Sequence, residues 1–217
     1  MKKILNTLCC LLAALAVVGC SIDDMETTGA IHGYACDKEG TPLVGSTVEL
    51  LGTGRKAVVD AEGRFYFFHV PAGLAQIQLT QADGTQINEN VQVPIDNVMT
   101  VALQEWHKDF PFVLEYASDF TSTGDRKGLN LDVRLTNASN VPQTCSVYGE
   151  GELSISQVSP PYFVPNGISA GEEMTLDPGK YARITVSQTL ESLTGFNKMY
   201  ISWNGKRQVV VFHTTHT

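Results

Sequence analysis

Short runs in which apolar and polar residues alternate fill most of the chain from Ala30 onward, and no stretch shows the 3.6-residue period of an amphipathic helix. Within residues 74–80, for example, every second side chain from Ala75 to Leu79 is apolar, and the residues between them are glutamines. Such alternation is typical of a strand with one buried and one solvated face. The pattern therefore predicts an all-β fold. It excludes dinucleotide-binding and barrel enzymes, which need many amphipathic helices and more chain than 217 residues.

One irregular segment divides the predicted strands into two groups. The first group occupies residues 31–37, 46–51, 64–69, 74–81, 86–93 and 98–103. The second group occupies residues 129–136, 145–148, 153–157, 173–176, 181–187, 199–203 and 207–213. Residues 105–111 lie between the groups, contain Pro111 and lack regular alternation. We therefore expect two consecutive β-sandwiches, at residues 30–104 and 105–217.

Turn residues mark the ends of many of these strands. Residues 37–40 and 60–63 share the pattern D-x-E-G, in which the aspartate can accept a bond from the backbone two residues on and the glycine can adopt a positive φ. Asn204-Gly205 is a strong signal for a two-residue hairpin. Neither D-x-E-G stretch supplies the alternating ligands of an EF-type calcium loop. We expect hairpin turns there and no metal site.

The first twenty residues have the features of a secretion signal. Lys2 and Lys3 precede an uninterrupted apolar run over residues 8–18. This run is too short for a permanent membrane span, but it has the length of a signal-peptide core. We expect residues 1–19 to be removed. Two alternatives are cleavage by the ordinary signal peptidase, with Cys20 incidental, and a retained signal anchor.

The end of that run, Val17-Val18-Gly19-Cys20, resembles the bacterial lipobox. The resemblance implies diacylglycerol on the Cys20 sulfur and usually a third acyl chain on the new amino terminus. Two or more acyl chains anchor a protein stably, whereas one chain binds a membrane only marginally. We expect the small, acidic residues 20–29 to form a flexible tether.

The start of the tether, S-x-D-D, is similar to the acidic export signal of Bacteroidetes lipoproteins. That similarity implies a location on the outer face of the outer membrane, and an ordinary solvated linker is the alternative. The chain has a formal net charge of −8, and its first twenty residues contain two lysines and no acidic residue, so the processed chain is more acidic still. Nucleic acid and other polyanions are therefore excluded as expected partners.

Cysteine usage does not indicate a disulfide framework. Cys9 and Cys10 leave with the signal, and Cys20 carries lipid, so only Cys36 and Cys145 remain for the folded part. These two residues fall in different predicted sandwiches. We expect them to be buried free thiols, although a single bridge between them is possible on the sequence alone.

The glycines, proline and aromatics of the first predicted sandwich occur in the order found in carboxypeptidase regulatory-like domains. The matching residues are Ile31-His32-Gly33, the stretch 37–48, the stretch 59–67 and Val70-Pro71 with Gly73. The resemblance implies a seven-stranded, transthyretin-like sandwich of Greek-key type that performs no chemistry itself. In Bacteroidetes the same module occurs in outer-membrane receptors and in lipoproteins.

The second predicted sandwich is similar to bacterial Ig-like modules of the Hydin type. The similarity is carried by residues 135–142, which read LTNASNVP, and residues 176–186, which include Asp177-Pro178-Gly179. It implies a second Greek-key sandwich that acts as a scaffold. The intersheet cysteine pair of antibody domains is absent from the sequence.

A search for catalytic motifs gives no candidate. The five histidines form no H-E-x-x-H pair, and the closest two, His213 and His216, follow a strand near the chain end. Gly167-Ile168-Ser169-Ala170-Gly171 matches the letters G-x-S-x-G, but no helical pattern follows it as a nucleophile elbow requires, and residues 52–56 lack the spacing of a phosphate-binding loop. We expect no catalytic residues, no cofactor and no metal site.

Aromatic residues are the remaining candidates for a binding surface. Phe65 and Phe67 should be buried on one face of their strand, and Tyr66 and Phe68 should emerge on the other. The other sheet or the second domain is the expected cover for that second face, and an external protein or glycan is the alternative. Four other aromatic residues are also candidates for a binding surface. Trp203, Tyr181 and Tyr200 are expected in the core, with a sugar-stacking surface as the alternative, and Trp106 is expected to wedge between the domains.

These observations predict a non-catalytic, lipid-anchored protein of the bacterial outer membrane, exposed at the cell surface. It would act as a structural or protein-interaction module accessory to a nutrient-uptake receptor. The alternative is a glycan-binding lipoprotein that uses exposed aromatics. The expected partners are the membrane, through lipid on Cys20, and a protein or glycan at the cell surface.

Overall fold

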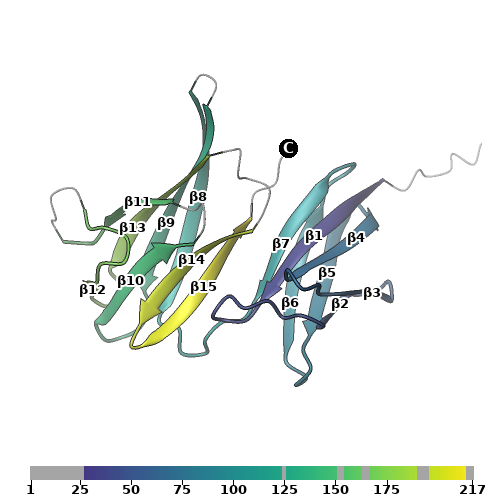
Figure 1. Cartoon of the computed structure of the whole chain (residues 1–217), viewed down its shortest axis with the longest axis horizontal. Coiled ribbons are helices and arrows are strands. Elements are labelled where there is room, and N and C mark those ends of the chain that lie inside the picture. The colour runs from purple at the N-terminus through teal and green to yellow at the C-terminus, as the bar shows by residue number, and fades with distance from the viewer. Residues whose placement is uncertain (1–26, 124–125, 151–153, 163–166, 190–195, 214–217) are drawn as a thin grey trace, which may run out of the picture.

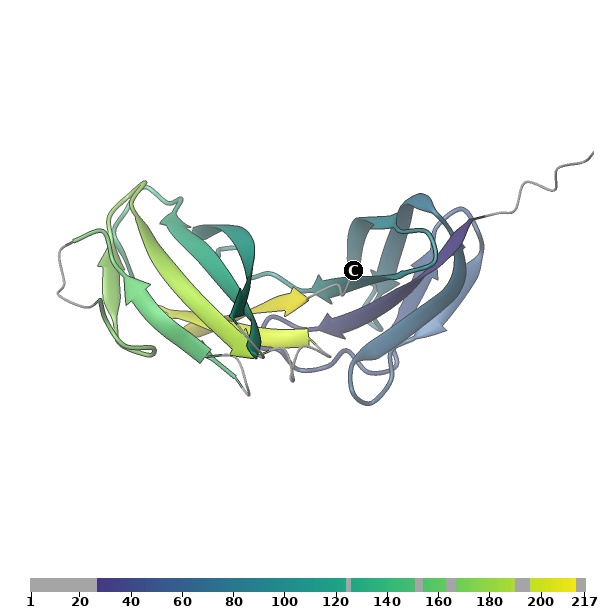
Figure 2. The same cartoon turned by 90° about the horizontal axis from the view of Figure 1, so that it is seen from above.

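The computed structural model describes residues 27–123, 126–150, 154–162, 167–189 and 196–213. These residues form fifteen β-strands and no helix, so none of their segments is a membrane-spanning helix. The strands build two β-sandwiches that lie end to end and give the molecule an elongated shape (Figure 1 and Figure 2). The prediction of an all-β chain with two consecutive sandwiches is confirmed.

The N-terminal sandwich contains seven strands. They are β1 (Thr28–Cys36), β2 (Thr47–Leu50), β3 (Arg55–Val58), β4 (Arg64–Pro71), β5 (Gly73–Thr80), β6 (Gln86–Val93) and β7 (Val98–Gln104). One sheet has the order β4-β1-β7 and the other has the order β3-β2-β5-β6. All neighbours are antiparallel except β1 and β7, which run parallel from the Ala30–Val98 pair to the Cys36–Gln104 pair.

The short edge strand β3 was not among the predicted strands. Its side chains are at most half-buried, because β3 lies at the end of its sheet. A strand with no fully buried face lacks the strong apolar alternation on which the prediction depended. The six predicted strands of this sandwich are all present, with boundaries that shift by at most a few residues.

The core of the N-terminal sandwich forms around Phe65, which is 1% exposed. The ring of Phe65 lies directly over Gly33 of β1. A Cβ atom at Gly33 would lie 1.8 Å from the Phe65 ring, so only glycine permits this packing. Burying such an aromatic side chain contributes about 1.5–3 kcal/mol, and the glycine in β1 makes that burial possible.

Both D-x-E-G stretches form the predicted turns. The Asp37 carboxylate accepts hydrogen bonds from the backbone nitrogens of Glu39 and Thr41, at 2.9 and 2.8 Å. Asp60 makes the equivalent pair of bonds in the second turn. Gly40 closes the first turn with a φ of +89°, a conformation that L side chains rarely adopt.

The C-terminal sandwich contains eight strands. They are β8 (Phe112–Thr123), β9 (Arg126–Asn137), β10 (Gln143–Gly149), β11 (Ser154–Ser159), β12 (Met174–Leu176), β13 (Tyr181–Thr189), β14 (Phe196–Trp203) and β15 (Lys206–His213). Their two sheets have the orders β12-β10-β14-β15 and β11-β13-β9-β8. All pairs of neighbours are antiparallel. The Asn204-Gly205 hairpin is confirmed, with φ values of +45° and +71° between β14 and β15.

Strand β8 corrects the expectation of seven strands in this sandwich. It starts directly after Pro111 and pairs with β9 along its whole length. At its start, Val113 and Glu115 are exposed, because β8 is an edge strand. The irregular segment 105–111 therefore ends where β8 begins. The sequence pattern did not show this boundary, because it indicated no strand between residues 111 and 129.

Candidate functional site

The two sandwiches meet along strand β15, the outermost strand of its sheet. The backbone nitrogen of Val209 donates to the carbonyl of Lys38 at 2.8 Å. The Gln104 side chain donates to the Val209 carbonyl at 3.3 Å and accepts from the Val211 nitrogen at 2.9 Å. Its carboxamide thus takes the place of a peptide group on a neighbouring strand and covers the open edge of β15. We call this contact, formed by Lys38, Gln104, Gln208, Val209 and Val211, the seam.

A second buried amide completes the polar part of the seam. Gln208 is fully buried, and its Nε2 donates to the carbonyls of Glu105 and Val209, each at 2.9 Å. Its Oε1 accepts from the backbone nitrogen of His107 at 2.9 Å. Buried amides stabilise a contact only when their donors and acceptors are paired, and both glutamine side chains meet this condition.

Apolar and aromatic side chains from both sandwiches pack beside these amides. The cluster comprises Tyr34, Cys36, Tyr200, Val209 and Val211. Lys198 reaches across from the C-terminal sandwich and donates to the carbonyl of Gly40 at 2.9 Å. Burial raises the pKa of the Cys36 thiol to about 12. The contact between the sandwiches is therefore a small core of its own, in which apolar side chains are buried and polar groups are hydrogen-bonded.

The linker between the sandwiches places its aromatic residues in different environments. Phe110 and His107 pack edge-on against the Trp203 ring, at centroid distances of 5.1 and 5.2 Å. Trp106 contacts Phe110 but remains 46% exposed. The expectation that Trp106 wedges between the domains is therefore wrong, because Phe110 and His107 already cover Trp203 and leave Trp106 at the surface.

Trp106 lies where two depressions meet, and both depressions are also lined by Glu89 and Gln104. One depression has a volume of about 460 Å³ and is mainly apolar, with walls that include Val91, Val101, Phe112, Leu114 and Val210. The other has a volume of about 740 Å³ and is lined mainly by polar residues, which include Lys38, Asp83, Asn88, Glu105 and Lys108. We call them the apolar arm and the polar arm of the Trp106 groove. Volumes of this size are typical of ligand sites.

Polar groups of the groove differ in whether another described residue pairs with them. Glu89, Asn90 and Lys108 have no hydrogen-bond or ion-pair partner among the residues that the structure describes. Burial raises the pKa of the Glu89 carboxyl. These groups are therefore available to a ligand, in contrast to the amide of Gln104, which is used in the seam.

A second exposed surface lies on strand β4. Tyr66 and Phe68 are 41% and 61% exposed, and their ring planes differ by only 3°. His32 of β1 stacks on Tyr66 at a centroid distance of 4.5 Å, and burial lowers the pKa of His32. We call these three residues the aromatic platform. The predicted division of residues 65–68 between two faces is confirmed. The second domain reaches this surface at His32, whose ring packs edge-on against Phe196 at 5.2 Å, and it leaves Tyr66 and Phe68 exposed.

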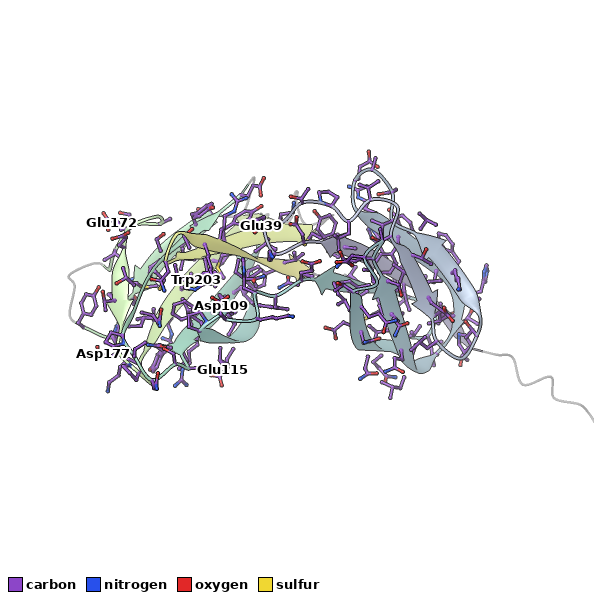
Figure 3. The ribbon with its side chains drawn as sticks, turned by 90° about the horizontal axis from the view of Figure 1, so that it is seen from below. Glu39, Asp109, Glu115, Glu172, Asp177 and Trp203 are labelled. Atoms are coloured by element: carbon purple, nitrogen blue, oxygen red, sulfur yellow. The ribbon has the colours of Figure 1, made fainter. Side chains whose placement is uncertain are left out.

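The aromatics of the C-terminal sandwich are mostly core residues. Trp203 is 3% exposed and lies inside the sandwich (Figure 3), and Tyr200 is buried in the contact with the N-terminal sandwich. Tyr181 is 44% exposed and lies 3.9 Å from the Arg134 guanidinium, measured to its ring centroid. The core prediction is confirmed for Trp203 and Tyr200 and is wrong for Tyr181, because that residue starts β13 at a sheet surface.

The remaining residues named in the sequence analysis are only partly covered by the described residues. Cys20, its signal segment and His216 lie outside the described residues, as does the side chain of His213. Cys36 and Cys145 are free and buried, as expected. Among the described residues, no group of three or more His, Cys, Asp or Glu side chains is arranged to hold a metal ion.

Apart from Trp106, sequence reasoning did not identify the residues that define the seam and the groove. One signal was available for Glu89, because this charge interrupts the apolar face that Ile87 and Val91 form on strand β6. No local signal marks Gln104 or Gln208, since each amide bonds to residues about a hundred positions away in the sequence.

Comparisons with known proteins identify no family. A scan against protein-family models found no match, and a search of the curated proteins found none either. Among solved structures, the chain is similar to a chain of a type II cohesin–X-dockerin complex from Acetivibrio cellulolyticus, at 27% identity with a TM-score of 0.29. The match spans 34% of this chain and only 52% of that one, so the chain covers about half of its length.

Two further similarities extend over most of the chain. The major pilin SpaD of Corynebacterium diphtheriae matches at 11% identity over 87% of this chain and 66% of the pilin, with a TM-score of 0.31. A candidate carbohydrate-binding protein of Bacteroides uniformis matches at 15% identity over 86% of this chain and 99% of its own, with a TM-score of 0.24. At these TM-scores, the fold assignment depends on the strand order and register described above.

Proposed function

We propose that this protein is a non-catalytic lipoprotein, anchored through Cys20 at the outer surface of a bacterial outer membrane, whose two sandwiches act as one rigid binding module. The observation that carries the module is the seam, in which Gln104 and Gln208 join the sandwiches through buried, hydrogen-bonded amides. Contacts between the domains of one chain are usually more polar than obligate protein–protein interfaces, and they usually permit the domains to move relative to each other. A rigid joint keeps the surfaces of both sandwiches in fixed relative positions, so that one partner can contact both.

The N-terminal sandwich fits this role as a carboxypeptidase regulatory-like domain. In support, it has seven strands, the two D-x-E-G turns and the glycine that accommodates Phe65. Such a domain performs no chemistry, and the Ig-like sandwich that follows it would extend the scaffold. The partner is a protein or a glycan at the cell surface, and a nutrient-uptake receptor is the protein partner that we propose.

The anchor is tested by the substitution Cys20→Ser in the native host. The wild-type protein is expected to sediment with the cell envelope and to be cleaved by protease added to intact cells, whereas the variant is expected in the soluble fraction. Cys9→Ser is the matched control, because Cys9 leaves with the same signal, and it should behave as the wild type. A Cys20→Ser protein that stays in the envelope would disprove the lipid anchor. Protection of the wild-type chain on intact cells would disprove surface exposure.

A glycan is the second candidate partner, favoured by the nearly parallel, exposed rings of Tyr66 and Phe68. Flat aromatic faces can pack on the apolar faces of sugar rings. Native electrophoresis through gels that contain a neutral polysaccharide tests this candidate. Retardation of the protein in at least one such gel is expected if it binds glycan, and equal mobility in every gel would favour a protein partner.

A further inference from the structure

The Trp106 groove combines an exposed aromatic ring with two arms of opposite character. The indole of Trp106 is 46% exposed at the point where the arms meet. Ligand sites in proteins are typically apolar hollows with a few converging polar groups. A ligand that follows both arms must therefore present apolar faces in one direction and many hydrogen-bonding groups in another.

The carboxylate of Glu89 is the polar group best placed for such a ligand, since it lines both arms. Its neighbours on the inner face of β6 are Ile87 and Val91, and its register partner on β5 is the fully buried Ile77. Partial burial beside these apolar groups raises the pKa of Glu89. A carboxylate in this position is stabilised by any ligand that donates hydrogen bonds to it.

The charges along the polar arm do not favour an ionic ligand. Its lining residues include Lys38 and Lys108 together with the carboxylates of Asp83, Glu89 and Glu105. Phosphate-rich ligands need a cluster of positive charge, and strongly cationic ligands need the reverse. Neither sign prevails in the arm, so an uncharged, polyhydroxylated ligand suits it best.

An extended peptide is the competing occupant, because the free edge of β6 borders the groove. Consecutive residues of β6 and the turn before it, from Thr85 to Val91, line the two arms. However, Glu89 lies on the face of β6 that carries Ile87 and Val91, where its side chain is exposed at the groove. Gln86 and Asn88 lie on the outer face, where both bond to Gln78. A charge on an edge strand is a device that prevents the addition of another strand.

We propose that the Trp106 groove binds a neutral oligosaccharide, with one sugar ring stacked on the Trp106 indole and sugar hydroxyls donating to the Glu89 carboxylate. The apolar arm accommodates ring faces, and the polar arm accommodates hydroxyl groups of the following units. This site rests on the proposed function of a binding module and names its ligand class. It lies at the joint between the sandwiches and is separate from the aromatic platform, whose residues line neither arm.

The test uses the full chain purified in detergent and a panel of neutral hexasaccharides derived from α-glucan, β-glucan, mannan and xylan. Isothermal titration calorimetry is expected to detect binding of at least one member. Trp106→Ala should weaken that binding at least about tenfold, and Glu89→Gln should weaken it by about threefold to tenfold. Tyr66→Ala is the matched control, because Tyr66 is exposed to a similar degree but belongs to the aromatic platform, and it should change the affinity by less than about twofold.

Three results would overturn the proposal. The first is that no member of the panel binds at about 10 mM. The second is that Tyr66→Ala abolishes sugar binding while Trp106→Ala does not, which would move the site to the aromatic platform. The third is Trp106-dependent binding of a short peptide of alternating valine and threonine in place of the sugars, which would indicate strand addition at β6.

Two features of the design keep the result interpretable. Circular dichroism and thermal unfolding of Trp106→Ala establish that the variant is folded, and Glu89→Gln tests a second lining residue independently. The measurement is made in solution on purified protein, so a negative result would leave the Cys20 anchor unaffected. Conversely, an anchor that failed the fractionation test would leave sugar binding in the groove intact.

Discussion

The seam and the Trp106 groove lie on two sides of Gln104, yet their polar groups have opposite fates. In the seam, the amides of Gln104 and Gln208 bond to backbone groups of the other sandwich or its linker. In the groove, Glu89 and Lys108 have no partner in the part of the chain that the structure describes. The first arrangement fixes the joint, and the second leaves groups available for a ligand. Hydrogen-bond satisfaction therefore distinguishes a structural contact from a candidate site within a single junction.

The largest expected effect comes from breaking the seam with Gln208→Leu. The substitution leaves partly buried backbone groups of Glu105 and His107 without these side-chain partners, and it should lower the free energy of unfolding by about 3 kcal/mol. Denaturant unfolding measures the loss. Gln76→Leu, at an exposed position of β5, is the control and should change stability by less than about 0.5 kcal/mol. Equal effects of the two substitutions would show that the buried amide does not hold the joint.

The two buried thiols provide a more local probe of the same joint. Burial raises the pKa of both Cys36 and Cys145 to about 12, so at about pH 8 both remain protonated and should resist iodoacetamide in the native protein. Cys36 packs at the contact between the sandwiches, and Cys145 lies within the core of the C-terminal one. In Gln208→Leu, Cys36 should be alkylated at least about tenfold faster than Cys145. Mass spectrometry of the alkylated peptides measures both rates, and equal rates would mean that the joint opens only when the whole protein unfolds.

The smallest expected effect concerns the groove side of the junction. Burial raises the pKa of Glu89 in the folded state, so the folded protein holds this proton more tightly than the unfolded chain does. The ionised carboxylate therefore costs stability above the folded-state pKa, and the cost disappears as the pH falls below the unfolded-state pKa.

Glu89→Gln should consequently stabilise the unliganded protein slightly at neutral pH, by no more than about 0.5 kcal/mol because the site is largely solvated. The gain should vanish towards about pH 3, below the usual pKa of a glutamate. Unfolding curves of both proteins across this pH range measure the difference. A loss of stability at neutral pH would mean that the Glu89 carboxylate has a partner in the free protein, contrary to its proposed availability.

Features that depend on neighbouring residues were predictable from the sequence. The Asp37 turn, the Asn204-Gly205 hairpin and the opposite exposure of Phe65 and Tyr66 each follow from a few adjacent positions. Strands β3 and β8 were missed because both are edge strands with exposed apolar or polar side chains. Their pairing is determined by neighbours that local patterns do not reveal.

The groove and the seam were not predictable, because both depend on which ends of the two sandwiches meet. Gln104 bonds to Val211, which lies 107 positions later in the chain. Trp106 was correctly placed at the boundary between the sandwiches, but its exposure depends on Phe110 and His107 having already covered Trp203. Such competition between side chains for one contact is visible only in three dimensions.

The parallel pairing of β1 with β7 determines how the N-terminal sandwich would bear mechanical load. Strand β1 begins at Thr28, at the end of the sandwich away from the junction, and β7 leads from the junction end directly into the linker with Trp106 (Figure 2). Tension between a tether at Thr28 and a ligand held beside Trp106 would pull these two strands in opposite directions along their length. The hydrogen bonds between them would then be sheared together and would not open one after another. A force applied between the proposed anchor and the proposed ligand site would thus act on the strand pair in its most resistant direction.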